Sequence, residues 1–369
     1  MACKKHQTNL EHLTTDTLIS LIQLGLHGTS NSKVQIATHV SWPEVLKMAS
    51  MQGVSAICLD GMQQLTEQPA LDKALKLQWI GGVLKQEQAW QQQWRMAQQL
   101  AALYAANGIG TYVMKGFSLS RLYPQPAHRP CTDMDCFLLA QDGTCAYGAG
   151  NDIAAHNGLK VNCGYYKHSK ILLRGLTVEN HQYLLPVKGS GKAKRFEREL
   201  RSWIDDGHNA HIGETELRAT SPFFDAVFVL AHAQEHFLTE GIILRHICDW
   251  AMVLKAHGST VNWQEWKKVC QTYGLLSFGY AMSRLAQRIC GVDIPFDCPS
   301  NDDADRRLLD DTLYRQPGCD RQASDFKVRV ALIRNMMRDS WKYRLFSDTN
   351  SLLFCTRRVW GYLFDKDLD

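Results

Sequence analysis

Apolar residues recur at helical spacing through the first part of the chain. A capping-type start at Thr15 or Asp16 and a stop at Gly28 delimit the first predicted helix. Residues 41–44 read Ser-Trp-Pro-Glu, a capping box with proline at an early helical position, and they predict the start of a second helix. The chain is therefore predicted to be helical up to about residue 107.

A long helix is predicted over residues 71–108. Gly81 and Gly82 are expected to break or bend it, because glycine inside a helix costs conformational entropy. Its apolar residues follow helical spacing and form one stripe, made of Trp90, Trp94, Ala97, Ala101 and Tyr104.

The pattern changes to alternation at Gly108. Strands are predicted at 109–116 and 131–139, with a helical turn between them that ends at Pro124. A loop rich in glycine and asparagine is expected over 141–161. Residues 165–185 predict a long strand or a hairpin that turns near Arg174–Gly175. This block is the α/β part of the chain.

Helical spacing returns after a linker near residue 190. Ser221 and Pro222 are predicted to cap and open one helix, and further helices are expected to near Tyr362. The expected fold class is α+β, a small mixed β-sheet with flanking helices between two helical regions. The three regions are an N-terminal helical region (1–107), an α/β core (108–190) and a C-terminal helical domain (191–369).

Composition limits the functions that need to be considered. The chain has 369 residues, 45% hydrophobic and 21% charged, which suits a globular protein of two or three domains. A net charge of +4 does not indicate nucleic-acid binding, and no specific nucleic-acid motif is present. The twelve cysteines form no C-x-x-C pair, and no signal peptide or membrane-length apolar run occurs. A cytoplasmic protein with reduced thiols and no membrane partner is expected.

The segment RPCTDMDCFLL carries the first candidate chemistry. On a strand, Asp133 and Asp135 share a face with Phe137 and Leu139, because side chains alternate. Two carboxylates on one face, about 7 Å apart along the backbone, repel each other unless a cation lies between them. Glu179, on a later strand, supplies a third carboxylate, and such a set suits Mg²⁺, which prefers oxygen ligands.

Lys115 and Gly116 occupy a strand-to-helix turn that precedes the aspartates. Such a turn presents free backbone N–H groups and a positive helix end, which suit a phosphate. Two Mg²⁺ ions ~3.5–4 Å apart can hold both the attacking and the leaving oxygen of an in-line displacement at phosphorus.

Two blocks of the sequence resemble a known family. The order K-G, R-x-x-x-D-x-D and E-x-H, from Lys115 through Arg129 to His181, resembles the polymerase-beta-type nucleotidyltransferase superfamily. More narrowly, it is similar to a bacterial family assigned as nucleotidyltransferases. The C-terminal helices carry a second block similar to that family's H-x-x-x-H-F…G-x-x-L-R-x-x-x-D-W signature, on His232, His236, Phe237, Gly241, Leu244, Arg245, Asp249 and Trp250.

The resemblance implies a nucleotidyltransferase core that uses Mg²⁺ or Mn²⁺ and a nucleoside triphosphate such as ATP. The nucleotidyl group would move to a hydroxyl of a small molecule, a protein or an RNA. Asp133 and Asp135 would be metal ligands, and Glu179 a third ligand that positions the acceptor or acts as a base. The expected phosphate contacts are Lys115, the backbone of Gly116 and Ser118, Arg129 and His181. The residues expected to pack the helices against the core and to line the cleft are His232, His236, Arg245 and Asp249.

Two features depart from the superfamily pattern. Gly116 is followed by Phe117, where a second glycine or a serine is usual. The helix usual before the third-carboxylate strand is replaced by the predicted loop 141–161. Without a bound phosphate, Arg129 is expected to pair with Asp133 or Asp135.

Other interpretations stay open. A binding or scaffold protein could keep the fold without turnover. The segment His232–His236 fits the H-x-x-E-H pattern of zinc peptidases, with Glu235 as base. The basic run within 188–201 is either a solvated helix face or a surface that attracts anions, and GSGK at 189–192 lacks the other residues of a Walker A motif.

Overall fold

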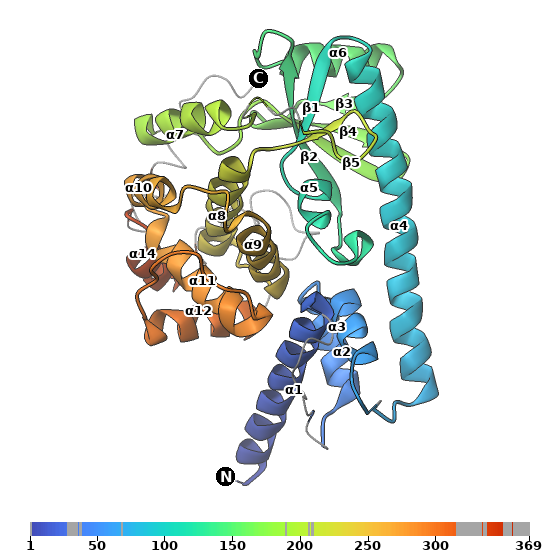
Figure 1. Ribbon diagram of the computed structural model, residues 1–369, viewed down its shortest axis with the longest axis vertical. Helices are drawn as coiled ribbons and strands as arrows, with labels where there is room; N and C mark the ends of the chain where they lie inside the picture. Colours follow the sequence, from blue (N-terminus) through green and yellow to red (C-terminus); the bar gives the residue numbers. More distant parts are fainter. Residues whose placement is uncertain are drawn as a thin grey trace.

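A computed structural model describes residues 2–27, 36, 39–67, 69–188, 190–205, 207, 210–314, 334, 338–349 and 356, with side chains from residue 12 onward. A six-stranded sheet lies at one end of the molecule, and helices from both halves of the chain lie below and beside it (Figure 1). The α+β class predicted from the sequence is confirmed.

The sheet is mixed, with strand order β3-β4-β5-β2-β1-β6. Its strands are β1 (Ile109–Val113), β2 (Asp133–Ala140), β3 (Lys160–Asn162), β4 (His168–Leu173), β5 (Leu176–His181) and β6 (Leu217–Ala219). The central strand β2 runs antiparallel to β1 and parallel to β5. β4 and β5 form the hairpin predicted to turn at Arg174–Gly175, where Gly175 has a φ of 85°.

The two faces of β2 divide as its alternation predicts. Met134, Cys136 and Leu138 are fully buried against helices α4 (Lys73–Ala105) and α6 (Tyr147–His156). Phe137 belongs instead to the larger core that includes the C-terminal helices. The aspartates, which share the face of Phe137, are therefore on the side of the sheet turned toward those helices.

Helix α4 is one continuous element that runs along most of the height of the molecule (Figure 1). The predicted break at Gly81 and Gly82 is wrong: both lie inside the helix, where a Cβ atom would meet nothing within 4 Å. Residues of high helix propensity on either side carry the helix through this pair. The predicted stripe is confirmed, since Ala97, Ala101 and Tyr104 are buried beneath the sheet, and Trp90 and Trp94 pack on the same core.

The loop predicted over 141–161 is also wrong, because most of it forms α6 and β3. Glycine at position 150 reduces helix propensity but is needed for packing. A Cβ atom there would lie 2.1 Å from Cδ1 of the buried Leu138, so any other residue at this position would have to displace that side chain. The helix that the family pattern places before the third-carboxylate strand is thus present.

The N-terminal region forms α1 (Ala2–His27), α2 (Trp42–Met51) and α3 (Ser55–Gln63) before α4. α1 ends where predicted but begins well before Thr15, because no glycine or proline interrupts the preceding residues. Ser41 is the N-cap of α2, yet its side chain caps no N–H group. The predicted capping box, in which the Glu44 N–H group would donate to Ser41, is therefore not formed.

Close contact between α1 and α3 depends on two glycines. A Cβ atom on Gly61 would lie 1.9 Å from the Leu21 carbonyl oxygen, and one on Gly25 would lie 2.1 Å from the Ile57 carbonyl oxygen. We expect Gly61→Ala to lower the free energy of unfolding by about 2–3 kcal/mol, because backbone must move apart. Urea unfolding would measure this. The matched control is Gly81→Ala, which meets no atom and should raise stability by up to about 1 kcal/mol; equal effects of the two would contradict the packing argument.

The remaining described helices are α5 (Phe117–Ser120), the 3₁₀ turn η1 (Pro126–His128), α7 (Gly191–Ser202), α8 (Pro222–Thr239), α9 (Leu244–His257), α10 (Trp263–Tyr273), α11 (Leu276–Cys290), α12 (Asp302–Tyr314) and α14 (Ser340–Phe346). Ser221 caps α8 as predicted, since its hydroxyl accepts a hydrogen bond from the Phe224 N–H group. The expected helix end near Tyr362 lies outside the described residues.

One apolar core joins the N-terminal helices, the C-terminal helices and the lower face of the sheet. Every cysteine whose side chain is described is free, and the sulfur atoms of Cys248 and Cys290, 3.8 Å apart, are too far from each other for a disulfide. Within the described part of the chain, every helix is too short or too polar to cross a membrane.

Candidate functional site: an acidic cluster beneath the sheet

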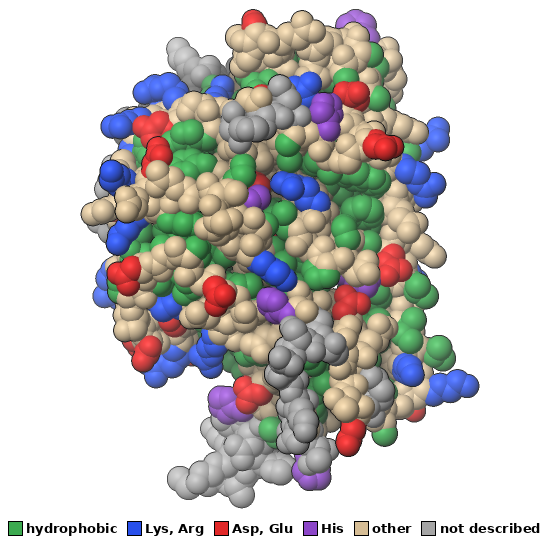
Figure 2. Space-filling view, in the orientation of Figure 1, with side chains coloured by type: hydrophobic (Ala, Val, Ile, Leu, Met, Phe, Trp, Pro, Cys, Tyr) green, Lys and Arg blue, Asp and Glu red, His purple; other side chains and the backbone are tan. Residues whose placement is uncertain are grey.

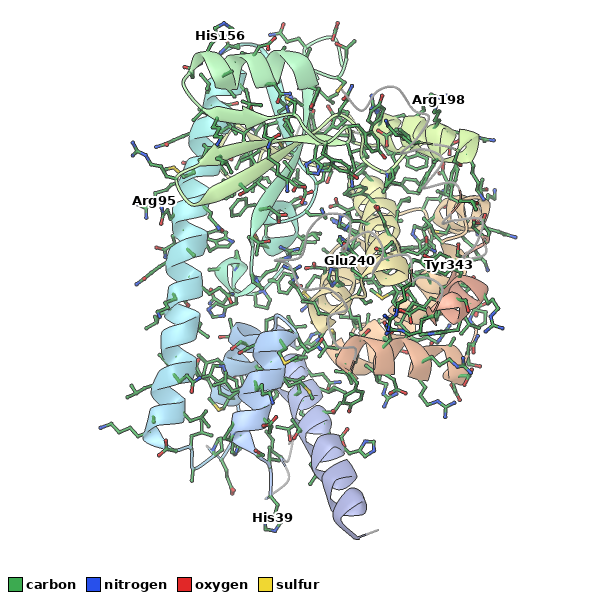
Figure 3. All side chains as sticks on the ribbon, turned by 180° about the vertical axis from the view of Figure 1, so that it is seen from behind. His39, Arg95, His156, Arg198, Glu240 and Tyr343 are labelled. Atoms are coloured by element: carbon green, nitrogen blue, oxygen red, sulfur yellow. The ribbon has the colours of Figure 1, made fainter. Side chains whose placement is uncertain are left out.

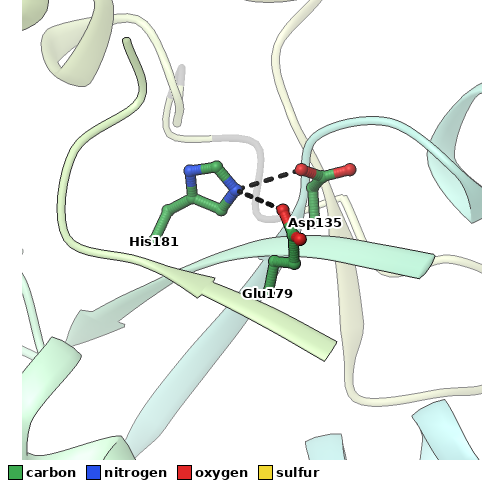
Figure 4. A group of neighbouring side chains, drawn as sticks. All are labelled: Asp135, Glu179 and His181. Carbon is green, nitrogen blue, oxygen red and sulfur yellow. Dashed lines mark hydrogen bonds and ion pairs between the residues drawn. The ribbon is translucent and has the colours of Figure 1, made fainter. Parts of the chain in front are cut away.

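The parallel pairing of β2 with β5 places Asp135 directly beside Glu179. His181, two residues further along β5, lies on the same face (Figure 4). Ligand atoms of the three side chains all lie within 4.8 Å of one another. The two carboxylates therefore come from separate strands and meet at one point, as the sequence predicted for Asp135 and Glu179.

Asp135 is only 4% exposed, and each of its carboxylate oxygens has a nitrogen partner. The Lys115 ammonium lies 3.0 Å from Oδ2, and Nε2 of His181 lies 3.0 Å from Oδ1. Burial raises the pKa of Asp135, but the charge of Lys115 and the hydrogen bond from His181 outweigh it, so the net pKa is well below the usual value. Asp135 is therefore ionised and able to bind a cation.

Glu179 has more distant nitrogen partners than Asp135 has. Its carboxylate is 3.4 Å from Nδ1 of His168 and 3.5 Å from the half-exposed Lys170 ammonium. Burial raises the pKa of Glu179, and the neighbouring charges of Asp135 and Asp133 raise it further. Glu179 is thus the carboxylate of this group that takes up a proton most readily.

His181 connects the two carboxylates. Its Nδ1 donates to the Tyr183 carbonyl oxygen at 2.9 Å, and its Nε2 faces Asp135 at 3.0 Å and Glu179 at 3.9 Å. Both ring nitrogens of His181 therefore face oxygen atoms. If a cation replaced the Nε2 proton, the bond to Tyr183 would keep the ring in place with its Nε2 lone pair toward the cluster.

Asp133 is less closely involved than the sequence predicted. It is the first residue of β2, half-buried, two positions from Asp135 on the same face. It lies opposite Thr177 on β5, and its Oδ1 accepts a hydrogen bond from the Thr132 hydroxyl. Its carboxylate is not among the ligand atoms that lie within 4.8 Å of one another. Its role as a metal ligand stays a prediction.

The turn after β1 brings the Lys115 side chain into the cluster, while the Ser118 N–H group forms a hydrogen bond within the turn. Gly116 has a φ of 52°, and a Cβ atom there would lie 3.2 Å from the Asp133 carbonyl oxygen, so the turn requires glycine. The N–H group of Ser118 donates to the Lys115 carbonyl oxygen at 2.9 Å, within the turn. The backbone of Gly116 and Ser118 as a phosphate cradle also stays a prediction.

Arg129 does not pair with Asp133 or Asp135, which corrects the pairing expected from the sequence. Its guanidinium binds Asp249 on α9 through two hydrogen bonds of 2.7 and 2.9 Å. The Tyr123 hydroxyl donates to the same carboxylate at 2.7 Å. Arg129 and Asp249 are each 5% exposed. Arg129 therefore joins the core segment to α9, and its role as a phosphate contact stays a prediction.

The histidines of α8 line the C-terminal side of the cluster. Nε2 of His232 lies 2.8 Å from the Lys115 ammonium, and because an ammonium only donates, this nitrogen accepts. Burial lowers the pKa of His232 to well below its usual value, and the charge of Lys115 lowers it further, so the ring is neutral. His236 packs on it with ring centroids 4.5 Å apart. Arg245 donates to the Pro130 carbonyl oxygen at 3.1 Å.

His232, Arg245 and Asp249 thus each contact the core segment, and their predicted place in the wall of a cleft stays a prediction. These contacts count against the zinc-peptidase interpretation. The free electron pair of His232 Nε2 already accepts a hydrogen bond from Lys115. Among the residues that the structure describes, three potential metal ligands lie close together only at Asp135, Glu179 and His181.

Sequence reasoning missed the residues of β4. His168 stacks on His181 with ring centroids 5.1 Å apart, and burial lowers the pKa of His168 to about 3. Lys167, the residue before β4, is 8% exposed. A hairpin with a two-residue turn at 174–175 pairs His168 with His181 and Lys170 with Glu179, so the predicted turn contained the signal that locates them.

The basic run within 188–201 forms a solvated helix face. Arg195 pairs with Glu199 on the exposed side of α7, and Arg198 points outward (Figure 3). Figure 2 shows basic side chains mixed with acidic ones over α7 and α10. A cavity of about 230 Å³ lies between α7 and α8, with Lys188 and Lys192 in its wall. Its lining residue Ala231 is adjacent in sequence to His232, so the cavity and the cluster share α8.

The fold and the site together define a class: an α+β protein in which two neighbouring strands bring carboxylates together beside a lysine and a helical region. Residues 38–291 match the model of a family described as uncharacterised nucleotidyltransferase. The chain belongs to this family, as the resemblance of its motifs predicted. No curated protein and no solved structure matches the chain. Family membership supports nucleotidyl transfer as the general activity.

Proposed function

We propose that the protein is a metal-dependent nucleotidyltransferase that moves a nucleoside monophosphate group from a nucleoside triphosphate to a hydroxyl acceptor. The observation that supports this best is the side-by-side position of Asp135 and Glu179 on parallel strands, with His181 in ligand range. The reduced thiols of the described cysteines suit the cytoplasm, where nucleoside triphosphates are abundant, and we propose that it acts there.

The donor set fits Mg²⁺ or Mn²⁺. Asp135 and Glu179 offer the carboxylate oxygens that both ions prefer, and His181 adds a nitrogen that suits Mn²⁺ better than Mg²⁺. Asp133, on the same face of β2, would complete the set if its side chain turned inward. When bound, such an ion neutralises phosphate oxygens and stabilises the charge that develops during phosphoryl transfer.

The protein's own residues would then bind and orient the substrates. Lys115, whose ammonium lies 3.0 Å from Asp135 Oδ2, would bind a phosphate oxygen of the nucleotide. Glu179 has the raised pKa expected of a group that accepts a proton from an attacking hydroxyl. His232, neutral and beside Lys115, keeps this lysine turned toward the cluster.

A second candidate is a protein of the same fold that binds without turnover. One observation favours it: Lys115 and His181 already bind the two carboxylate oxygens of Asp135, so this carboxylate has partners without a metal ion. In such a protein these ion pairs would stay closed when nucleotide is added.

Thermal unfolding with ATP, CTP, GTP or UTP, in the presence of Mg²⁺ or Mn²⁺, separates the two candidates. We expect at least one nucleotide to raise the Tm by about 2–5 °C, since saturating ligand stabilises by roughly 2–4 kcal/mol. EDTA should abolish the shift, and so should Asp135→Asn, whereas Asp152→Asn on the exposed side of α6 should keep it. No shift with any nucleotide would contradict the transferase proposal and support the alternative.

A further inference from the structure

Glu197 is a buried carboxylate on the inner side of α7. It is 3% exposed and shares the buried face of this helix with Phe196 and Leu200. A carboxylate in such a place is unfavourable unless it is paired and hydrogen-bonded. Its partners therefore explain why a charged residue stands among apolar ones.

Both carboxylate oxygens of Glu197 accept hydrogen bonds from the chain that follows β5. The N–H group of Leu184 lies 3.0 Å from each oxygen, and that of Leu185 lies 3.1 Å from Oε2. Residues 182–185 form neither helix nor strand, so the N–H groups of Leu184 and Leu185 have no strand partner and need another acceptor. Glu197 supplies this acceptor and so fixes the backbone of the segment.

Arg201 binds the same segment from one turn further along α7. Its Nε donates to Oε1 of Glu197 at 2.8 Å, and its Nη2 donates to the Gln182 carbonyl oxygen. The guanidinium also lies over the rings of Phe137 and Tyr183, 5.3 and 5.4 Å from their centroids. A lysine could not make these contacts together, because it lacks the planar fork of donors.

The segment that α7 holds contains the carbonyl group that orients His181. Nδ1 of His181 donates to the Tyr183 carbonyl oxygen at 2.9 Å, and Nε2 then faces Asp135 at 3.0 Å. The Tyr183 carbonyl and the Leu184 N–H group belong to one peptide group. His181 and Glu197 therefore bind the two ends of the same peptide plane.

We infer that Glu197 and Arg201 are positioning residues that keep His181 turned with Nε2 toward the metal-binding cluster. The inference rests on the proposed function, because it assumes a divalent cation there. A histidine ligand is normally held through its other ring nitrogen, and here the acceptor of that nitrogen is itself set in place by α7. The peptide plane is rigid, so losing the hydrogen bond to its N–H group also turns its carbonyl.

Binding of Mn²⁺ alone and of Mg²⁺ alone to the full chain, measured by calorimetry, tests this inference without any turnover. Glu197→Gln leaves one acceptor oxygen where the carboxylate uses two. We expect it to weaken Mn²⁺ binding about 10-fold, since loss of an outer contact of a histidine ligand costs about 10- to 100-fold. Mg²⁺ binding should change less, because Mg²⁺ prefers oxygen to the nitrogen of His181. The matched control is Glu199→Gln on the same helix, which should bind both ions as the wild type does.

A second background separates positioning from a general loss of structure. His181→Asn removes Nε2, so adding Glu197→Gln to it should have no further effect on Mn²⁺ binding. Equal losses with and without His181 would overturn the inference, and so would equal losses for Mn²⁺ and Mg²⁺ or unchanged Mn²⁺ binding in Glu197→Gln.

Arg201→Lys serves if Glu197→Gln does not fold, because it keeps the buried carboxylate and the positive charge. It loses the simultaneous bonds to Glu197 and to the Gln182 carbonyl, so it should weaken Mn²⁺ binding in the same direction, again more than Mg²⁺ binding. Unchanged Mn²⁺ binding in a folded Arg201→Lys chain would count against the inference. A wild type that takes up no Mn²⁺ would also overturn it, whereas failure of the proposed function is read separately, from the absence of a thermal shift with every nucleotide.

Discussion

Replacing Asp135 by asparagine is expected to lower the rate of nucleotidyl transfer by at least about 10³-fold. Asp135 is the most buried carboxylate of the cluster and is held in its ionised form by Lys115 and His181. Asparagine keeps the size and one oxygen but removes the charge that attracts a divalent ion. A bound cation contributes several kcal/mol to stabilising the transition state, and about 1.4 kcal/mol is a factor of ten in rate.

The measurement is release of pyrophosphate under single-substrate conditions, with the nucleotide that gives the largest thermal shift. Water can serve as the acceptor if no other is known, since many transfer sites hydrolyse their donor slowly. Asp152→Asn should match the wild type, because that carboxylate is exposed on α6 away from β2. If Asp135→Asn kept more than about a tenth of the wild-type rate with an unchanged Tm, the cluster could not be the metal site.

The parts of this structure that could be predicted are those governed by local periodicity. The alternation in β2 separates Asp135 from Cys136 and Leu138, whatever the strand packs against. Glycine at 175 predicts the hairpin turn, and the turn in turn sets the pairing of β4 with β5. The position of Glu179 followed from the family resemblance, since a parallel pairing of β2 with β5 leaves no local signal.

The parts that could not be predicted depend on contacts between distant segments. Gly150 lowers helix propensity, but its position against Leu138 decides the structure of 147–156. The expected partner of Arg129 was the nearest aspartate in the sequence, whereas the observed partner, Asp249, is contributed by a helix of the C-terminal region. Tertiary packing chooses among carboxylates that the sequence presents as equivalent.

The pair of Arg129 and Asp249 leads to the largest stability effect that we expect in this protein. Both side chains are about 6% exposed, and the guanidinium donates to both carboxylate oxygens. Asp249→Ala would leave a buried guanidinium without its counter-charge, which costs about 3–5 kcal/mol. Urea unfolding would measure this loss. Lys47→Ala is the matched control, since its pair with Glu44 is exposed and should change stability by less than about 0.5 kcal/mol.

The loss of unfolding free energy caused by Asp249→Ala should become smaller at acidic pH. Burial raises the pKa of Asp249, but Arg129 outweighs it, and the pKa in the folded protein is below the usual value. The stabilisation is therefore fully present above the unfolded pKa of about 3.9 and is lost as the pH falls through the lower folded pKa. The wild type and Asp249→Ala should accordingly approach each other in stability below about pH 4. A difference that stayed constant down to pH 2.5 would show that Asp249 acts through packing, because a packing contribution does not require the carboxylate to be ionised.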